Sequence, residues 1–126
     1  MDHAQLETFI ARYISMWHES DAHRRRELVH ELWAEDAENI TRRFIVRGMP
    51  QIILRVDRAH QEWVASRGFI FRSSGNADSH NNVVKFFWEM LPRDGGPIEA
   101  RGLDIFVLND DRRIRSLYQF PERTSG

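Results

Sequence analysis

The hydrophobic pattern of this chain changes at Gly68 from mostly helical to extended. Before Gly68, apolar side chains recur chiefly at three- and four-residue steps, which is the repeat of an amphipathic helix. After Gly68 they follow the two-residue repeat of strands, with polar turns between them. Helices followed by consecutive strands predict an α+β fold in which the N-terminal helices pack in the concave face of a strongly bent, mostly antiparallel sheet.

Two helices are expected before residue 37. The first opens near Asp2, which can cap it, and carries one apolar stripe. The stripe consists of Leu6, Phe9, Ile10, Tyr13, Ile14 and Trp17. Ser20 and Asp21 can cap the second helix, whose apolar face is expected to hold Leu28, Leu32 and Trp33. The arginines at positions 24–26 are predicted to form its solvated face.

Residues 37–46 have a strand-like pattern, with Asn39, Thr41 and Arg43 on one face. Pro50 favours the start of a third helix and Gly68 its end. The stripe of this helix is Ile53, Val56, His60, Trp63 and Val64. Four strands are then expected, at 69–71, 82–91, 102–108 and 113–120, and residues 1–126 are predicted to form a single domain.

Composition limits the chemistry that is open to the chain. Basic and acidic side chains nearly balance, 18 against 19, so nothing indicates a nucleic acid or anionic membrane as partner. There is no cysteine, His30-Glu31 lacks a second histidine, and no glycine-rich phosphate loop occurs, so no metal or cofactor is expected. The segment MDHAQLETF does not resemble a signal peptide and no apolar run is long enough to span a membrane, which predicts a cytoplasmic location.

Asp104 is the residue that most needs an explanation. It lies in the segment GLDIFVL, among Leu103, Ile105, Phe106 and Val107. Burying a carboxylate costs free energy unless the group has a partner or a chemical task. Its sequence neighbourhood therefore makes Asp104 a candidate functional residue.

Three strings of the sequence resemble a known family. They are ARYISMWHESD, ELWAEDAENIT and GLDIFVLNDDRRIRSLYQF. Together with the order of elements they resemble the cone-shaped, cystatin-like α+β family that includes nuclear transport factor two, ketosteroid isomerase and the SnoaL-like polyketide cyclases. The resemblance covers nearly the whole chain and is more specific for the fold than for the reaction.

The resemblance to ketosteroid isomerase implies an oxyanion hole formed by Tyr13 and Asp104. In such a fold Asp104 would face an apolar cavity, where desolvation favours its protonated form, and both groups would donate hydrogen bonds to a ligand carbonyl. The general base of that enzyme falls here on Thr41, which cannot take a proton at neutral pH. An ion pair of Asp104 with Arg101 or Arg115, and a Tyr13 that only packs, are the structural alternatives.

The resemblance also implies an apolar slot for a flat or cyclic ligand. Its expected lining is Trp17, Thr41, Val84, Phe86, Trp88 and Leu117, although ordinary core packing explains the apolar ones equally well. Glu38 and Asp36 are the nearby candidates to replace the missing base, and strand alternation turns Glu38 away from the slot. His80 is placed at the mouth of the slot as an acid or base, or else as a loop histidine bonded to backbone.

Three functions follow from these expectations. The first is a cofactor-free enzyme of the isomerase or cyclase type acting on a small hydrophobic carbonyl compound, with Asp104, Tyr13 and His80 as its catalytic residues. The second is a protein that binds such a compound without turnover. The third is an interaction module. In each case Phe87, Ile105 and Val107 predict an apolar outer sheet face that forms a two-fold homodimer.

Overall fold

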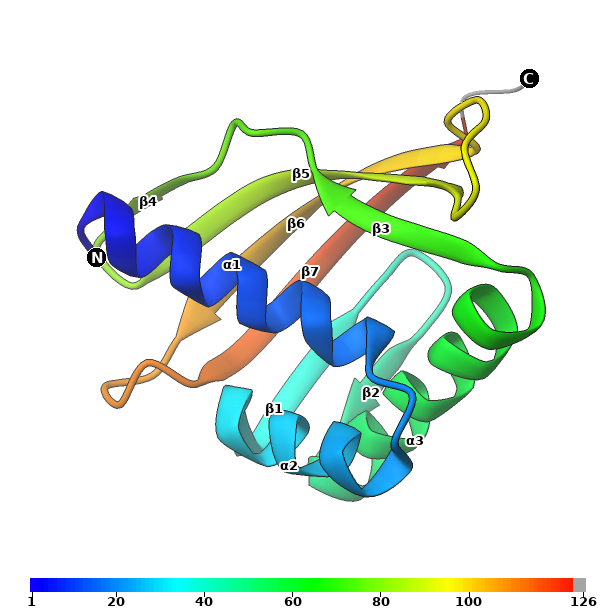
Figure 1. Ribbon diagram of the computed structural model, residues 1–126. Helices are drawn as coiled ribbons and strands as arrows, with labels where there is room; N and C mark the ends of the chain where they lie inside the picture. The colour runs from blue at the N-terminus through cyan, green and yellow to red at the C-terminus, as the bar shows by residue number, and fades with distance from the viewer. Residues whose placement is uncertain (124–126) are drawn as a thin grey trace.

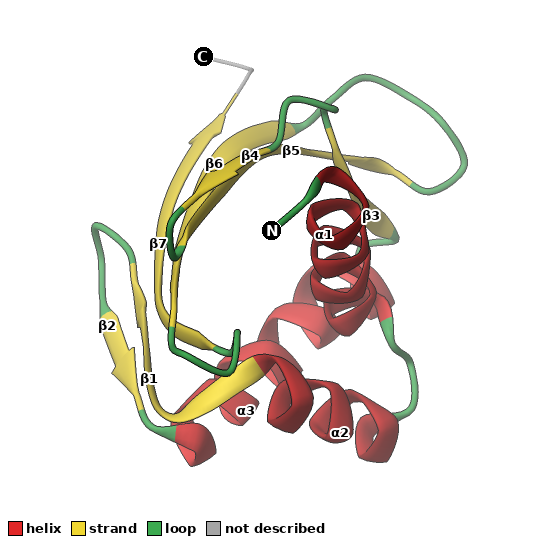
Figure 2. Ribbon diagram, turned by 90° about the vertical axis from the view of Figure 1, so that its left-hand side faces the viewer, coloured by secondary structure: helices red, strands yellow, loops and turns green. Residues whose placement is uncertain are grey.

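A bent, seven-stranded sheet wraps around one long helix in the computed structural model, which describes residues 1–123 (Figures 1 and 2). The helix is α1 (His3–His18), which lies along the concave side of the sheet. Helices α2 (Ala22–Leu32) and α3 (Met49–Ala59) cover one end, and the π-helical segment η1 (His60–Ser66) continues α3. This is the α+β architecture that the sequence predicted, with the helices N-terminal to most of the sheet.

The sheet has the strand order β2-β1-β7-β6-β5-β3, and the short strand β4 also pairs with β5. Its strands are β1 (Trp33–Ile40), β2 (Ile45–Arg47), β3 (Phe69–Ser73), β4 (Asp78–His80), β5 (Val83–Pro92), β6 (Ala100–Leu108) and β7 (Ile114–Arg123). All pairs are antiparallel except β1 with β7, which is parallel. The three long strands β5, β6 and β7 form the wall that faces α1 (Figure 2).

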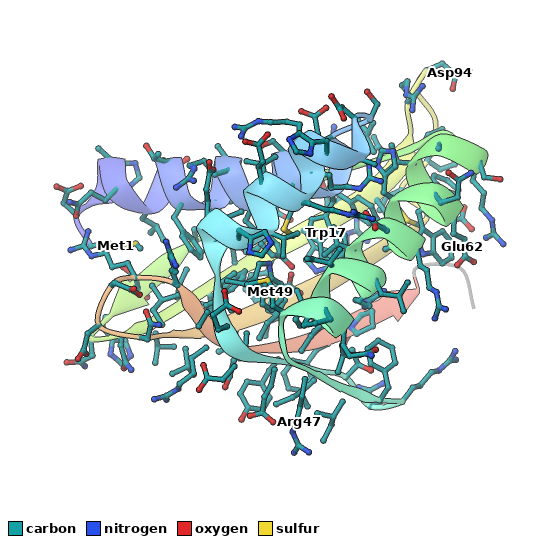
Figure 3. The ribbon with its side chains drawn as sticks, turned by 90° about the horizontal axis from the view of Figure 1, so that it is seen from below. Met1, Trp17, Arg47, Met49, Glu62 and Asp94 are labelled. Atoms are coloured by element: carbon teal, nitrogen blue, oxygen red, sulfur yellow. The ribbon has the colours of Figure 1, made fainter. Side chains whose placement is uncertain are left out.

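Helix α1 forms where its stripe and cap predicted. The Asp2 side chain accepts a hydrogen bond from the Gln5 backbone N–H at 2.8 Å, and the Gln5 side chain accepts one from the Asp2 N–H at 2.9 Å. This reciprocal pair satisfies N–H groups at the helix start. The buried stripe packs into the core, and Trp17 lies in the interior between helices and sheet, whereas Arg47 projects away from it (Figure 3).

Helix α2 differs from expectation at two positions. Arg25 is not part of a solvated face: it is buried, and its Nε donates to Asp57 Oδ1 of α3 at 2.9 Å. Trp33 is fully buried as predicted, but it is the first residue of β1 and not a member of the helix. A helix at the periphery of a core can bury one cation when a carboxylate on its neighbour compensates the charge.

The segment predicted as one strand over 37–46 is a hairpin. Strand β1 ends at Ile40, and the Thr41 N–H then donates to the Phe44 carbonyl at 2.9 Å to close the turn. Strand β4 was also missed, since its residues are polar and the segment was predicted as a turn. The four strands expected after Gly68 are present: β3, β6 and β7 are longer than expected, and β5 is shifted by one residue.

Strand β6 alternates as its sequence predicts. Gly102, Asp104, Phe106 and Leu108 are buried, whereas Leu103, Ile105 and Val107 are only partly covered. The register places Asp104 between Phe86 of β5 and Gln119 of β7. None of the helices within residues 1–123 combines the length and apolar character needed to cross a membrane.

Candidate functional site

Asp104 lies at the centre of a group of polar side chains on the inner face of the sheet. It is 1% exposed. Its Oδ1 accepts a hydrogen bond from Trp88 Nε1 at 3.0 Å, and its Oδ2 accepts one from the Tyr13 hydroxyl at 2.9 Å. Gln119 Nε2 approaches Oδ2 at 3.5 Å. The carboxyl group therefore receives donors from α1, β5 and β7 at once.

Burial controls the protonation of this group. It raises the pKa of Asp104 from 3.8 to about 6, against the opposing effects of the hydrogen bonds from Tyr13, Trp88 and Gln119 and the charge of Arg55. Burial, followed by the charge and hydrogen bond of Asp104, raises the pKa of Tyr13 well above its ordinary value. Tyr13 thus remains a neutral donor while Asp104 exchanges a proton close to neutral pH.

Gly102 allows Trp88 to reach Asp104. The two residues are paired across β5 and β6, and the Trp88 ring lies against the Gly102 backbone. A Cβ atom at Gly102 would be 2.2 Å from Cζ2 of that ring, a distance that no real side chain tolerates. The glycine is therefore required here for close approach of the indole, which then donates to a carboxylate two residues along the strand.

A second group of polar side chains fixes the amide of Gln119. Its Oε1 accepts hydrogen bonds from Asn39 Nδ2 at 3.0 Å and Arg55 Nη2 at 3.4 Å. Arg55 Nε also donates to Asn39 Oδ1 at 3.3 Å. Because the amide oxygen of Gln119 is occupied on that side, its NH2 group is left to face Asp104. Residues of β1, α3 and β7 thus orient one of the donors to the carboxylate.

Aromatic rings enclose the Tyr13 hydroxyl and Asp104. The Tyr13 ring makes edge-to-face contacts with Trp17, Phe86 and Phe106, at centroid distances of 5.9, 5.8 and 4.8 Å. Leu117 is fully buried on the same face of the sheet. The structure thus brings the predicted residues Tyr13, Trp17, Phe86, Trp88 and Leu117 into one core region, in which side chains occupy the expected slot.

The geometry differs from the predicted oxyanion hole in one respect. Tyr13 and Asp104 were expected to donate side by side to a ligand atom, but the Tyr13 hydroxyl donates to Asp104 itself. The alternative ion pair is not formed either, since Arg101 Nε lies 3.7 Å from Glu89 Oε2 and Arg115 is exposed. Asp104 is consequently a buried carboxyl group held by neutral donors.

Two predicted residues do not reach this site. His80 is exposed at the end of β4, where its Nδ1 lies 2.9 Å from Asn81 Nδ2. Thr41 lies in the hairpin turn, and its Oγ1 accepts from the backbone N–H groups of Arg43 and Phe44 at 3.1 and 3.3 Å. The Thr41 side chain is bonded within its own turn, and the His80 side chain is exposed to solvent. Neither residue therefore fits the role that was expected for it.

The replacement bases also lie elsewhere. Glu38 accepts from Arg47 Nε at 2.6 Å, in agreement with strand alternation, and Asp36 is exposed. Within the described residues no cluster of three or more histidine, aspartate and glutamate side chains is arranged for a metal ion.

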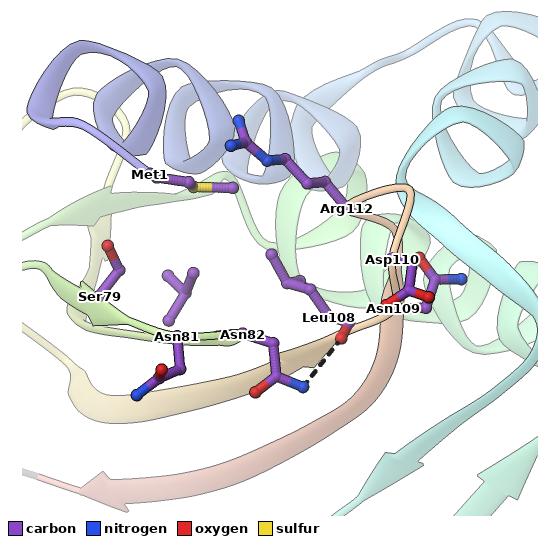
Figure 4. A pocket seen from close by; sticks show the side chains of 9 residues that line it. Met1, Ser79, Asn81, Asn82, Leu108, Asn109, Asp110 and Arg112 are labelled. Atoms are coloured by element: carbon purple, nitrogen blue, oxygen red, sulfur yellow. Dashed lines mark hydrogen bonds between the residues drawn. The ribbon is translucent and has the colours of Figure 1, made fainter.

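Two open cavities lie near Met1. One of them, of about 230 Å³, is bordered by polar residues of β4, the following turn and the β6–β7 turn (Figure 4). Val84 contributes to this cavity, and Asn82 Nδ2 donates to the Leu108 carbonyl at 3.2 Å beside it. Neither cavity is bordered by Tyr13 or Asp104.

Three members of the site were not predicted from the sequence: Asn39, Arg55 and Gln119. Gln119 follows Leu117 by two residues, so strand alternation places it on the inner face, and Asn39 has the same relation to Ala37. That signal was available. No comparable signal marks Arg55, because an arginine beside an apolar helix stripe is ordinarily solvated.

Comparison with known proteins gave matches at the level of structure. No protein-family model and no curated protein matches the sequence. A SnoaL-like family protein from Agrobacterium tumefaciens, provisionally described as an isomerase, superposes with a TM-score of 0.84 at 30% identity, covering 94% of this chain and 98% of that chain.

Two further solved structures share the fold at lower identity. A SnoaL-like protein of unknown function from Burkholderia thailandensis has a TM-score of 0.74 at 14% identity, covering 96% of this chain and 98% of its own. A provisionally assigned polyketide cyclase from Sinorhizobium meliloti has a TM-score of 0.68 at 15% identity, covering 90% and 94%.

Proposed function

Because the chain belongs to the SnoaL-like family, within the NTF2-like fold, we propose that it is a cofactor-free enzyme of the isomerase or cyclase type. Its substrate is a hydrophobic carbonyl compound, and Asp104 is the residue that takes up and returns the proton. The likeness to provisionally described isomerases and cyclases supports the reaction class. The choice of Asp104 depends on the chemistry of the site.

The observation that carries the proposal is the state of the Asp104 carboxyl group. It is 1% exposed, its pKa is raised to about 6, and Tyr13, Trp88 and Gln119 are its hydrogen-bond donors. A general base is most effective when its pKa lies near the working pH. Asp104 meets this condition without a histidine or a metal ion.

The proposed step begins with Asp104 ionised. Its carboxylate removes a proton from the carbon next to the substrate carbonyl, and the electron pair of that C–H bond moves onto the carbonyl oxygen to form an enolate. Once Oδ1 is protonated, the carboxyl group no longer carries a negative charge and Oδ2 is a weaker acceptor, so the Tyr13 hydroxyl can donate to the enolate oxygen instead. In a substrate with a carbon–carbon double bond conjugated to the enolate, Asp104 then returns its proton to the far carbon of that system. The electron pair on oxygen re-forms the carbonyl group, and the double bond has moved by one position.

The partly exposed residues indicate the route to the carboxyl group. Tyr13 is 2% exposed, whereas Trp88 and Gln119 are each partly exposed. A ligand that displaces the Trp88 ring would reach Asp104 Oδ1 without disturbing the contact of Tyr13 with Oδ2. A binding protein without turnover is the second candidate, since the same aromatic enclosure would hold a flat compound by itself.

Hydrogen exchange at the substrate carbon tests the proposal directly. In deuterated buffer, the protein should catalyse deuterium incorporation next to the carbonyl group of a compound in a panel of cyclic ketones and enones, measured by NMR. The rate should rise with pH through about 6, because the ionised form of Asp104 is the base. Asp104→Asn should lower it by roughly 100-fold or more, the usual contribution of a general base.

Asp57→Asn is the matched control for this experiment. It removes a carboxylate that pairs with Arg25 and lies outside the site, so it tests whether destabilisation alone lowers the rate. Exchange no faster than in buffer, for every compound in the panel, would reject the enzyme. If compounds raise the melting midpoint without any exchange, the binding protein becomes the better description.

We also propose that the protein is a two-fold homodimer that packs through its outer sheet face. Large apolar side chains are exposed there, and we name the set Ile45, Phe87, Tyr118 and Phe120 the outer apolar patch. Strand register supports the grouping, because Phe120 pairs with Leu103 and Leu103 with Phe87. Exposed apolar surface of this kind commonly marks an interface.

A further inference from the structure

Arg55 is unusual among the arginines of residues 1–122. Within residues 1–122, every arginine except Arg25 and Arg55 is exposed. Arg25 is neutralised by Asp57, at 2.9 Å from Nε to Oδ1, as is normal for a buried cation. Arg55 has no carboxylate partner within ion-pair distance among the described residues; its two polar contacts are with amide oxygens. It is therefore a partly buried positive charge without a direct counter-charge.

Arg55 also keeps unused hydrogen-bond donors. A guanidinium group has five N–H donors. Its Nε donates to Asn39 Oδ1 at 3.3 Å and its Nη2 to Gln119 Oε1 at 3.4 Å, and both of these bonds are long. No acceptor within the described part of the chain occupies Nη1. Two hydrogen bonds hold the guanidinium group in place, and its Nη1 donors remain for a ligand.

Two aromatic rings fix the faces of the guanidinium group. Its central carbon lies 5.7 Å from the Trp17 ring centroid and 5.0 Å from that of Phe44. Contacts of this kind orient the guanidinium plane and leave its edge for planar, two-point recognition of a carboxylate. Phe44 is 37% exposed although it is a large apolar residue, so this side of the site faces solvent.

The side-chain amide of Gln119 lies between Arg55 and Asp104, the proposed base. Gln119 accepts from Arg55 through Oε1 and faces Asp104 with Nε2. A ligand with its carbonyl at Asp104 would therefore have another part near Arg55. We infer that Arg55 binds a carboxylate of the ligand, and that the substrates are hydrophobic oxo acids. The inference deepens the proposed function and depends on it for the role of Asp104.

The test compares two probes that share one ring system. They are 2-naphthoate, which carries a carboxylate, and 2-acetonaphthone, its neutral ketone counterpart, and binding is measured by calorimetry on the full chain. The native protein should bind 2-naphthoate more tightly. Arg55→Met should weaken binding of 2-naphthoate by about tenfold or more, because charged hydrogen bonds are lost, and affect 2-acetonaphthone by less than about threefold.

Two further variants keep this test specific. Arg55→Lys should recover part of the affinity for 2-naphthoate, since the charge remains without the planar fork. Arg58→Met removes an exposed arginine that lies almost one turn further along α3, and should change neither affinity. Unfolding curves show whether each variant is folded under the conditions of the titration.

Three outcomes would overturn the inference. They are equal binding of both probes by the native protein, an affinity for 2-naphthoate that Arg55→Met leaves unchanged, and no binding of 2-naphthoate at all. The deuterium-exchange experiment with Asp104→Asn judges the proposed function separately, because neutral ketones are substrates in that assay. Exchange with neutral ketones but without preference for the acid would reject the carboxylate site alone.

Discussion

The inner and outer faces of β6 and β7 each carry side chains that burial or exposure alone would not favour. On the inner face, Asp104 is 1% exposed and hydrogen bonds connect it with Gln119. On the outer face, Tyr118 and Phe120 are 40% and 42% exposed. Two paired strands thus place a carboxyl group of β6 in the core and aromatic rings of β7 in solvent.

Each departure has a free-energy cost that folding alone does not explain. A buried carboxyl group loses hydration, and exposed aromatic surface orders water. Leucine or valine at the inner position, and lysine or threonine at the outer positions, would make the fold more stable. The proposed proton transfer and ligand binding would account for the inner face, and the proposed association with a second copy for the outer face.

The largest predicted effect concerns the inner face and pH. Asp104 has an ordinary pKa of 3.8 when unfolded and about 6 when folded, so between these values only the folded chain holds the proton. The free energy of unfolding should therefore decrease as pH rises through this window, by about 3 kcal/mol in total. The measurement is urea unfolding at a series of pH values, for the native protein and Asp104→Asn.

The difference between those two proteins isolates the contribution of Asp104, because all other carboxylates are common to both. As pH rises from about 4 to above 6, the free energy of unfolding of Asp104→Asn should increase relative to that of the native protein. Asp110→Asn, at an exposed position of the β6–β7 turn, controls for the removal of one negative charge. A difference that stays constant over the window would show that burial does not raise the pKa of Asp104.

The next effect concerns packing on the inner face. Gly102→Ala would place a Cβ atom 2.2 Å from Trp88 Cζ2, so the ring must move away from Asp104. Overpacking of this kind lowers the free energy of unfolding by about 1–3 kcal/mol, and tryptophan fluorescence should change with it.

A second substitution shows whether the ring is the cause. Trp88→Leu removes the atoms that clash, so the double variant Gly102→Ala, Trp88→Leu should lose less stability than the two single losses combined. Strictly additive losses would mean that the backbone at Gly102, and not its contact with Trp88, requires the glycine.

The smallest effect concerns the outer face. Tyr118→Arg or Phe120→Arg should weaken the proposed dimer by about 1–2 kcal/mol, or roughly tenfold in the dissociation constant, as measured by sedimentation. Leu54→Arg changes an equally exposed apolar residue on α3, away from the sheet, and should have no effect. A native protein that sediments as a monomer at micromolar concentration would contradict the dimer.

Sequence periodicity predicted the faces of the elements better than it predicted their partners. The helix stripe placed Tyr13 in the core, and the family resemblance implied an inward-facing Asp104; the structure joins the two by a hydrogen bond. Periodicity does not say that one would donate to the other, because that depends on how far α1 sits from the sheet. The same limit applies to Gln119. Strand alternation predicts that it faces inward, but not that it contacts Arg55.

The errors arose where charge or polarity was taken as a sign of exposure. Arg25 has a typical surface composition around it, and only the position of Asp57 on another helix explains its burial. Strand β4 has no apolar residue to signal it and forms because β5 offers a free edge. Thr41 fits a strand pattern, but its hydroxyl group favours the turn that it closes.

The hydrogen bond between Tyr13 and Asp104 joins residues that are 91 positions apart in the sequence. The parallel pairing of β1 with β7 is also between distant segments. Contacts of this kind have a large entropy cost, because a long loop must close before they add any stability. The raised pKa of Asp104 thus depends on the complete fold. In a partly folded chain, with α1 helical but not yet packed on the sheet, Asp104 would have the pKa of an ordinary aspartate.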